Sequence, residues 1–177
     1  MKKVIIIGPS GAGKSTLAAA LAVKLQLPHT ELDAINHQEN WTPIEADEFR
    51  EIVAEKSKEE GWVFCGNYFS TLGFDFWKKA DTIIWCDYPF SLVLKRLLSR
   101  TIHRTITRKE LWNGNKESFF VNFFSSDSVI LYMIKSWRKQ QRRYGPIFDN
   151  GANELPGVRL VRLKSPRDTK RFLDTVS

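Results

Sequence analysis

The sequence predicts an α/β fold in which a parallel sheet is covered by helices. Five short apolar segments bounded by turn residues alternate with stretches whose apolar residues recur at helical spacing. This alternation is typical of β-α-β units. The chain has 177 residues, about the length of one domain, and is long enough to bury one core. Hydrophobic residues make up 42% of it and charged residues 27%, which excludes collagen-like and wholly disordered classes.

The first half of the chain supplies four of the predicted strands. Val4–Ile7 is a β-branched run of the kind that is covered on both faces of a sheet. A glycine-rich turn, Gly8–Gly13, separates it from an Ala- and Leu-rich helix at Lys14–Leu25, so these segments form the first half of a β-α-β unit. The further predicted elements are a strand at His29–Leu32, a helix at Glu45–Glu60, a strand at Trp62–Cys65, a short helix near Thr71–Lys79 and a strand at Thr82–Cys86.

The second half is predicted to be mainly helical. A helix opens at Pro89 and runs toward Arg104, and Asp127 is a suitable cap for another helix that reaches Tyr144. Gly157–Leu163 is the last predicted strand. Pro166–Val176 is a closing helix with proline in its first turn, where its missing N–H costs nothing. No linker separates two domains, so we expect a single domain over residues 1–177.

Positive charge is concentrated in the second half of the chain. The net charge is +7 overall, but residues 1–90 hold 9 Lys/Arg against 13 Asp/Glu, whereas residues 91–177 hold 18 against 7. Most of the excess lies between Lys95 and Arg143. This asymmetry indicates an anionic ligand, carrying the phosphates of either a small molecule or a nucleic acid.

The sequence predicts a cytoplasmic protein without a membrane partner. The apolar run before Gly8 is shorter than a signal peptide requires, and the longest later run, Val129–Ile134, is far too short to cross a bilayer. Cys65 and Cys86 have no metal-ligand spacing and form no disulfide framework, which fits a reducing compartment.

A phosphate-binding pattern follows the first strand. Residues 8–15 match G-x-x-x-x-G-K-(S/T) at every fixed position, between a predicted strand and a predicted helix. Glycines let backbone N–H groups converge on phosphates, the helix N-terminus adds positive potential, Lys14 reaches the β- and γ-phosphates and Ser15 offers a hydroxyl to Mg²⁺. We therefore expect a nucleoside triphosphate to bind here. The expected contacts are Gly8, Pro9, Ser10, Gly11, Ala12, Gly13, Lys14, Ser15 and Thr16.

Further segments carry a family resemblance. The loop GPSGAGKST, a strand ending in LD, the segment WVFCGNY, and DTIIWCDYP followed by arginines at four-residue spacing resemble the adenylate-kinase-like family of small P-loop kinases. More narrowly, ELDAINHQENWTP, the GNY segment, ITRKELWNGNKESF and RLKSPRD are similar to the bacterial topology modulation proteins. Only the phosphate loop is a specific motif when it is taken alone. The other segments support the resemblance because they occur in the same order along the chain.

The resemblance implies the three-layer P-loop NTPase fold, with a five-stranded parallel sheet in the order 2-3-1-4-5. It also implies a helical lid at about residues 105–126 and an acceptor-binding flank at about residues 34–60. The activity it implies is transfer of the γ-phosphate of ATP, bound with Mg²⁺, to a small molecule such as a nucleoside, a nucleotide or a similar metabolite. Phosphoryl transfer depends on positioning and on charge stabilisation, so a lysine, arginines and a metal-holding carboxylate are needed.

The expected metal carboxylate is missing. In the family register, the strand beside the phosphate-loop strand is Trp62–Gly66, and Cys65 stands where an acid is usual. A thiol is a poor ligand for Mg²⁺, which prefers oxygen. We predict that Ser15 and Asp33 hold the metal instead, with Asp33 also a candidate for contact with the acceptor. Asp87, after the fourth strand, is a weaker candidate because aspartate before Tyr-Pro is also an ordinary turn residue.

Arginines at four-residue intervals share one side of a helix. Arg96, Arg100, Arg104 and Arg108 have this spacing, and like charges arranged so repel unless an anion offsets them. In the family, arginines matching Arg96 and Arg100 lie over the donor nucleotide. From the next helix, Arg138, Arg142 and Arg143 are placed to approach the γ-phosphate, and we predict catalytic roles for Lys14, Asp33, Arg100 and Arg138. We predict that the acceptor contacts are Asp33, His37, Trp41, Asn67 and Tyr68.

Two other functional classes remain open at this point. The basic half also fits a nucleotide-dependent regulatory protein associated with nucleic acid, since Lys and Arg contacts to phosphates drive such binding. We favour it less, because the chain has no recognisable nucleic-acid motif and ATP itself accounts for the basic residues. The replacement at Cys65 fits an inactive nucleotide binder. The sequence leaves the acceptor, and the choice between ATP and GTP, open.

Overall fold

The fold is built around one parallel sheet. The computed structural model describes residues 1–107, 113, 129–150 and 154–176. Its five strands lie in the order β2-β3-β1-β4-β5, and every neighbouring pair is parallel. The predicted sheet order is therefore confirmed. The strands are β1 (Lys3–Ile7), β2 (His29–Glu31), β3 (Trp62–Cys65), β4 (Thr82–Cys86) and β5 (Arg159–Leu163).

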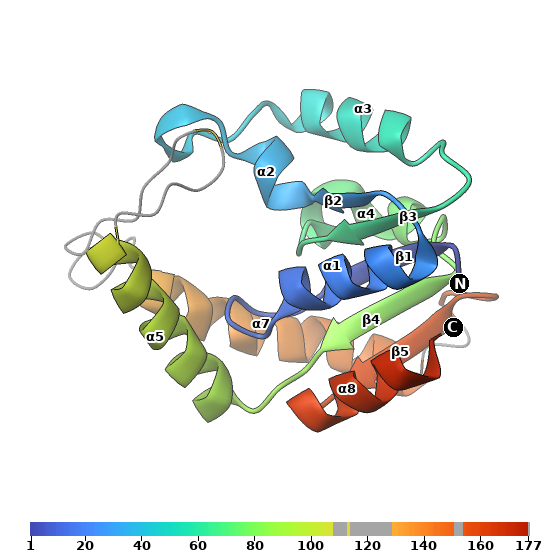
Figure 1. Ribbon diagram of the computed structural model, residues 1–177. Helices are drawn as coiled ribbons and strands as arrows, with labels where there is room; N and C mark the ends of the chain where they lie inside the picture. The colour runs from blue at the N-terminus through green and yellow to red at the C-terminus, as the bar shows by residue number, and fades with distance from the viewer. Residues whose placement is uncertain (108–112, 114–128, 151–153, 177) are drawn as a thin grey trace.

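Helices cover both faces of the sheet, as Figure 1 shows: α1 and α8 lie on the near face, and α4 and α7 lie behind it. The helical elements are α1 (Lys14–Leu25), α2 (Leu32–Asn36), the 3-10 turn η1 (Glu39–Trp41), α3 (Ala46–Lys56), α4 (Phe69–Trp77), α5 (Phe90–Thr107), α7 (Val129–Asn150) and α8 (Pro166–Thr175).

The alternation of side chains along each strand divides the core in two. Val4 and Ile6 of β1 face one layer, where they pack with buried residues of α1, α5 and α8. Ile5 and Ile7 face the other layer, with α3, α4 and α7. Because β1 is covered on both sides, its apolar run has no polar interruption. The second layer contains three fully buried tryptophans, Trp62, Trp77 and Trp85.

The strand register places one row of residues next to the phosphate loop. Ile6 of β1 pairs with Cys65 of β3, and Cys65 pairs in turn with Glu31 of the edge strand β2. Partners in neighbouring parallel strands point to the same face. Cys65 belongs to the core layer of α1, so Glu31 points to the α1 side of the sheet as well.

Several element boundaries differ from the sequence-based prediction. The second strand ends at Glu31, and Leu32 and Asp33 belong to the short helix α2, which was not predicted. Gly73 interrupts α4 with φ 67° and ψ −171°. The helix α7 continues through Pro146 to Asn150 instead of ending near Tyr144, and β5 begins at Arg159 instead of Gly157. Of the predicted lid at residues 105–126, residues 105–107 form the end of α5, and residues 108–112 and 114–126 lie outside the described residues, as does the cap Asp127.

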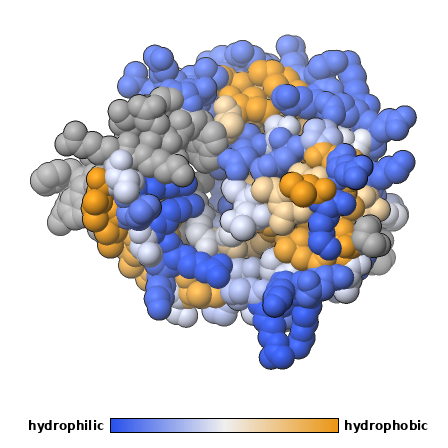
Figure 2. All heavy atoms as spheres, viewed as in Figure 1, coloured by the Kyte–Doolittle hydropathy of each residue, from blue (hydrophilic) through white to orange (hydrophobic). Residues whose placement is uncertain are grey.

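The surface is mostly polar on the face that carries α1 and α8 (Figure 2). Apolar residues are exposed on α5, where Ile102 is 44% and Ile106 is 77% exposed. Within the described ranges, no helix is both long enough and apolar enough to span a membrane.

Candidate functional site

The phosphate loop connects β1 to α1 and is packed against neighbouring elements. Gly8, Gly11 and Gly13 have φ values of 143°, 88° and 85°, which L side chains rarely adopt. A Cβ at Gly8 would lie 2.7 Å from the carbonyl oxygen of Cys86, and one at Gly11 would lie 2.8 Å from that of Val93. Only glycine fits at these two positions, so the loop is fixed against the end of β4 and the start of α5.

The side-chain amide of Asn67 holds the loop at its first glycine. Its Oδ1 accepts a hydrogen bond from the Gly8 N–H at 2.9 Å, and its Nδ2 donates to the Gly8 carbonyl oxygen at 2.5 Å. The structure thus places Asn67 beside the loop. Its predicted contact with the acceptor stays a prediction.

The two side chains that end the motif lie on the first turn of α1. Lys14 Nζ donates to the carbonyl oxygen of Pro9 at 3.2 Å, so the ammonium group lies over the loop whose N–H groups would bind phosphates. Ser15 is the next residue of the helix, and Thr16 follows it. Backbone N–H groups at this end of a helix attract anions.

Cys65 lies beside Ser15, as the family register implies. The Cys65 Sγ and Ser15 Oγ atoms are 4.0 Å apart, and β3 is the strand that pairs with β1. Burial raises the pKa of the Cys65 thiol to about 11, although the Lys14 charge acts in the opposite direction. The thiol is therefore protonated at neutral pH, and it offers Mg²⁺ neither charge nor oxygen.

Two carboxylates lie near this thiol. Asp33, in the first turn of α2, accepts a hydrogen bond at Oδ1 from the Tyr68 hydroxyl at 2.9 Å. Glu31 and Asp33 both act electrostatically on Cys65. Glu31 was missed by the sequence analysis, because only the pairing of β2 with β3 shows that it shares a row with Cys65.

The residues present fit a magnesium ion that keeps most of its water. Within the ranges that the structure describes, no group of three or more His, Cys, Asp or Glu residues is arranged to hold a metal. Mg²⁺ in phosphate sites commonly binds through one or two protein oxygens, with water and phosphate oxygens completing its shell. Ser15 and Asp33 meet that requirement, whereas Cys65 does not.

The Asp87 side chain forms hydrogen bonds with residues of β5 and α7. Its Oδ2 accepts from Arg162 Nε at 2.7 Å, and its Oδ1 accepts from Gln141 Nε2 of α7. Arg162 also bonds Asp149 at 2.8 Å and lies over the Trp85 ring at 4.5 Å. The Asp87 side chain is only 8% exposed, so these contacts favour a structural role over metal binding.

The arginines predicted to contact the donor lie on α5. The guanidinium of Arg96 is 5.5 Å from the Tyr88 ring centroid, and its Nη1 is 3.8 Å from the position of a Cβ built at Gly13. Arg96 therefore lies next to the phosphate loop. Arg100 and Arg104 follow on the same helix, and both are partly buried. Arg108 lies outside the described residues.

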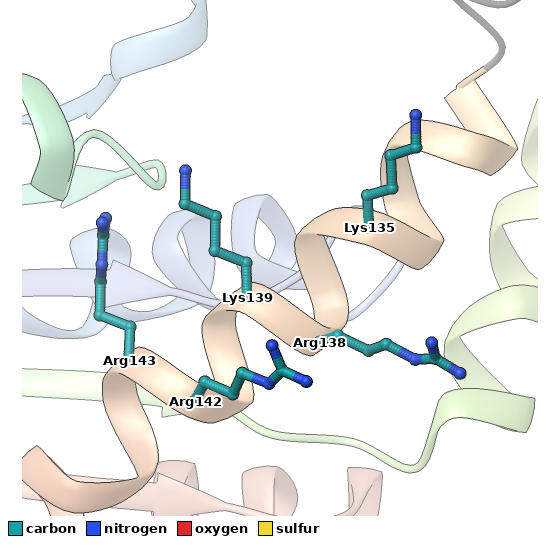
Figure 3. Close-up of a pocket in the computed structure, with 5 residues that line it drawn as sticks. All are labelled: Lys135, Arg138, Lys139, Arg142 and Arg143. Atoms are coloured by element: carbon teal, nitrogen blue, oxygen red, sulfur yellow. The ribbon is translucent and has the colours of Figure 1, made fainter.

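Five basic residues of α7 line an open hollow of about 530 Å³. Figure 3 shows them in two groups: three point to one side of the helix, and Arg138 and Arg142 point to another. The first group is Lys135, Lys139 and Arg143. The sequence analysis named the arginines and missed the two lysines, although the four-residue spacing of this group is visible in the sequence.

The predicted acceptor flank contains two aromatic contacts. The rings of His37 and Trp41 lie 5.6 Å apart, edge to face, and the Tyr68 ring packs on Phe49 at 4.7 Å. The His37 N–H donates to the carbonyl oxygen of Asp33 at 3.0 Å. The structure thus brings the side chains of Asp33 and Tyr68 together. His37 follows Asp33 by one turn of α2, and Trp41, which contacts the His37 ring, is 39% exposed.

The fold is that of small kinases of known structure. The chain superposes on shikimate kinase from Bacteroides thetaiotaomicron with a TM-score of 0.60 and 14% identity, over 98% of this chain and 94% of that one. For shikimate kinase from Acinetobacter baumannii in complex with shikimate, the TM-score is 0.59 at 14% identity, with 99% and 90% covered.

A gluconokinase from Sinorhizobium meliloti 1021 is similar with a TM-score of 0.52 and 15% identity, covering 98% and 91% of the two chains. The sequence matches no protein-family model and no curated protein. At this level of identity the likeness establishes the P-loop NTPase fold, and the activity has to be argued from the site.

Proposed function

We propose that this protein is a kinase that transfers the γ-phosphate of MgATP to a small-molecule acceptor. The observation that carries the proposal is the complete phosphate loop on α1, with Lys14 and Ser15 beside Cys65 and the Asp33 carboxylate close to that thiol. The structural neighbours support it, since they are kinases of small molecules. Membership of the topology modulation proteins is a narrower proposal that is supported by the sequence motifs alone.

Each residue has a distinct task in the proposed reaction. Backbone N–H groups of the loop and Lys14 bind the β- and γ-phosphates, and Ser15 and Asp33 hold Mg²⁺. The bound ion would neutralise charge on the phosphate oxygens. Arg96 and Arg100 approach from α5, and the proposed role of Arg138 is to stabilise charge on the transferred group from α7.

Asp33 has a second candidate task. Its hydrogen bond from the Tyr68 hydroxyl fixes the orientation of the carboxylate, so a second oxygen can accept the proton of an acceptor hydroxyl. We propose that the carboxylate performs one of these two tasks, not both at once. His37, Trp41, Asn67 and Tyr68 are the other proposed acceptor contacts. The proposed lid at residues 105–126 would close over the same region.

The test is ADP release from MgATP, with and without pools of nucleosides, nucleoside monophosphates and sugars. We expect release that depends on one pool. The Lys14→Ala variant should lower it about 100-fold or more, because a charge that acts on the transferred group is lost. Lys170→Ala, which removes an exposed lysine of α8, is the matched control. ADP release that is identical with and without every pool would contradict the proposal.

An inactive nucleotide binder is the second candidate, and Cys65 is the observation that favours it. A protonated thiol in place of a carboxylate deprives the metal of one anionic ligand. Tight ATP binding without acceptor-dependent ADP release would support this candidate. Salt-dependent binding of duplex DNA at saturating ATP would instead favour the association with nucleic acid that the basic half leaves open.

A further inference from the structure

The cations of α7 fall into two stripes. Lys135, Lys139 and Arg143 recur every four residues and form the first stripe, and Arg138 and Arg142 form the second. Figure 3 shows the two stripes pointing in different directions from the helix. Both stripes line the same hollow, but they leave the helix on different sides, and Arg143, which was predicted with Arg138 and Arg142 to approach the γ-phosphate, belongs to the first stripe.

The charge of the first stripe is not balanced by acids in the part of the chain that the structure describes. None of its three residues takes part in a salt bridge there. The only acid on α7 is Asp149, which binds Arg162. Like charges four residues apart destabilise a helix, so a bound anion would relieve this repulsion.

Contacts place one end of the stripe on the acceptor side of the site. The guanidinium of Arg143 lies 5.3 Å from the ring centroid of Phe69, at the start of α4. The preceding residue, Tyr68, donates to Asp33. Arg143 thus contacts the residue next to the one that bonds Asp33, the carboxylate proposed to face the acceptor, whereas Arg96 lies against the phosphate loop.

ATP, the phosphate donor, does not account for the three cations of the first stripe. The loop, Lys14 and Arg96 already lie where ATP phosphates would bind. A phosphate monoester carries close to two negative charges at neutral pH, and several cations bind it better than they bind a group with one charge.

We propose that the acceptor carries a phosphate group of its own, which the stripe Lys135, Lys139 and Arg143 binds. This proposal rests on the kinase function proposed above and names the class of its acceptor: a phosphorylated small molecule, such as a nucleoside monophosphate or a sugar phosphate. The transferred phosphoryl group then goes to a second position of the same molecule.

The experiment compares phosphorylated and unphosphorylated forms of one molecule. The protein is saturated with a non-hydrolysable MgATP analogue, and calorimetry at constant ionic strength measures binding of ribose and ribose 5-phosphate, of uridine and its 5′-monophosphate, and of glycerol and glycerol 3-phosphate. We expect the phosphorylated member of at least one pair to bind about tenfold more tightly or better.

Variants separate the stripe from general charge effects. Lys139→Gln, at an exposed position, should remove most of that preference, Lys139→Arg should restore it, and Lys170→Gln, at an exposed position of α8, should leave it unchanged. Equal affinities within every pair, no binding of any phosphorylated probe, or a preference that survives Lys139→Gln together with Arg143→Gln would overturn the proposal. The proposal would also be overturned if the only effect of these variants were a loss of duplex DNA binding.

Failure of the kinase function has a different signature. Binding of phosphorylated probes that depends on Lys139, without any ADP release when they are added, would retain the anion site and reject phosphoryl transfer. ADP release with an uncharged acceptor, unaffected by Lys139→Gln, would retain the kinase and reject the phosphorylated acceptor.

Discussion

At the scale of single residues, the Cys65 thiol gives a pH-dependent signal. Its pKa is raised from 9.0 to about 11 by burial, so the folded state holds the proton more tightly than the unfolded state. Its contribution to stability is complete below pH 9 and is lost as the pH rises through 11, by about 3 kcal/mol at most. We expect the free energy of unfolding to fall more steeply over this range in the wild type than in Cys65→Ser.

Urea unfolding at a series of pH values measures this difference. The pKa of Cys86 is raised as well, to about 12, mainly by burial and to a smaller extent by Cys65. Because Cys86 is present in both proteins, the difference between them is due chiefly to Cys65. Equal slopes in the two proteins would mean that Cys65 is not the buried, protonated thiol described above.

A carboxylate at position 65 should strengthen metal binding. In Cys65→Asp, an acid would stand beside Ser15, where it can hold Mg²⁺ directly or through water. Without the metal, a buried unpaired carboxylate costs several kcal/mol. We expect a Tm well below that of the wild type in EDTA, and a larger rise in Tm on addition of Mg²⁺ with an ATP analogue.

Cys65→Asn is the matched control, since it has the same shape without the charge. If Cys65→Asn gains as much from the metal as Cys65→Asp does, the carboxylate is not a ligand. ADP release by Cys65→Asp also separates the two proposed functions, because a gain of about tenfold or more would show that the missing acid limits transfer.

Residue roles were predicted from the sequence where a local pattern defines them. The loop from Gly8 to Ser15 is such a pattern, because its spacing is set by the geometry of one turn. The clamp of Asn67 on Gly8 joins residues 59 positions apart, and the position of Glu31 depends on strand register. Neither leaves a periodic signal in the sequence.

At the scale of elements, two glycines allow a direct comparison of backbone effects. Gly73 interrupts α4 at φ 67° and ψ −171°, and Gly145 lies within α7 without a positive φ; a Cβ at either would meet nothing within 4 Å. Gly73→Ala should therefore destabilise by about 1–3 kcal/mol through backbone strain alone. Gly145→Ala should change stability by less than about 1 kcal/mol, because the helix preference of alanine is opposed by the contact of its Cβ with the ring of Pro146.

Thermal and urea unfolding of the two variants tests this expectation. A Gly73→Ala protein as stable as the wild type would mean that α4 runs unbroken. The interruption was not predicted from the sequence, and neither was α2, which has only five residues and so no helical periodicity to detect. The central strands β1, β3 and β4 were predicted well because buried parallel strands are nearly continuous apolar runs.

At the scale of the whole molecule, a partly buried ionic network joins the sheet to α7. Arg162 of β5 bonds Asp87 and Asp149, and Gln141 of α7 donates to Asp87. Arg162→Met would leave the nearly buried Asp87 without its cation, so we expect a loss of about 3–5 kcal/mol. Asp149→Asn, at a carboxylate that is 64% exposed, should cost less than about 1 kcal/mol.

Urea unfolding again gives both free energies. Because the network holds the helix that carries the cationic stripe, Arg162→Met should also weaken binding of a phosphorylated probe, whereas Asp149→Asn should not. Equal stability losses in the two variants would show that burial of Asp87 has no special cost.

The overall topology was predicted from the family resemblance, and composition and periodicity gave only the α/β class. Short apolar runs do not state which strands are neighbours, since pairing is decided by long-range packing. The order β2-β3-β1-β4-β5 places the first strand at the centre of the sheet, as the resemblance implied.

That central position has a consequence for synthesis on the ribosome. The strand β1 leaves the ribosome first, yet its partners begin at Trp62 and Thr82. At a synthesis rate of about 5–20 residues per second, several seconds pass before both are available. During that time the apolar run Val4–Ile7 has no sheet neighbours, so the nascent chain exposes its most hydrophobic strand for longer than any other and depends on late, long-range closure to bury it.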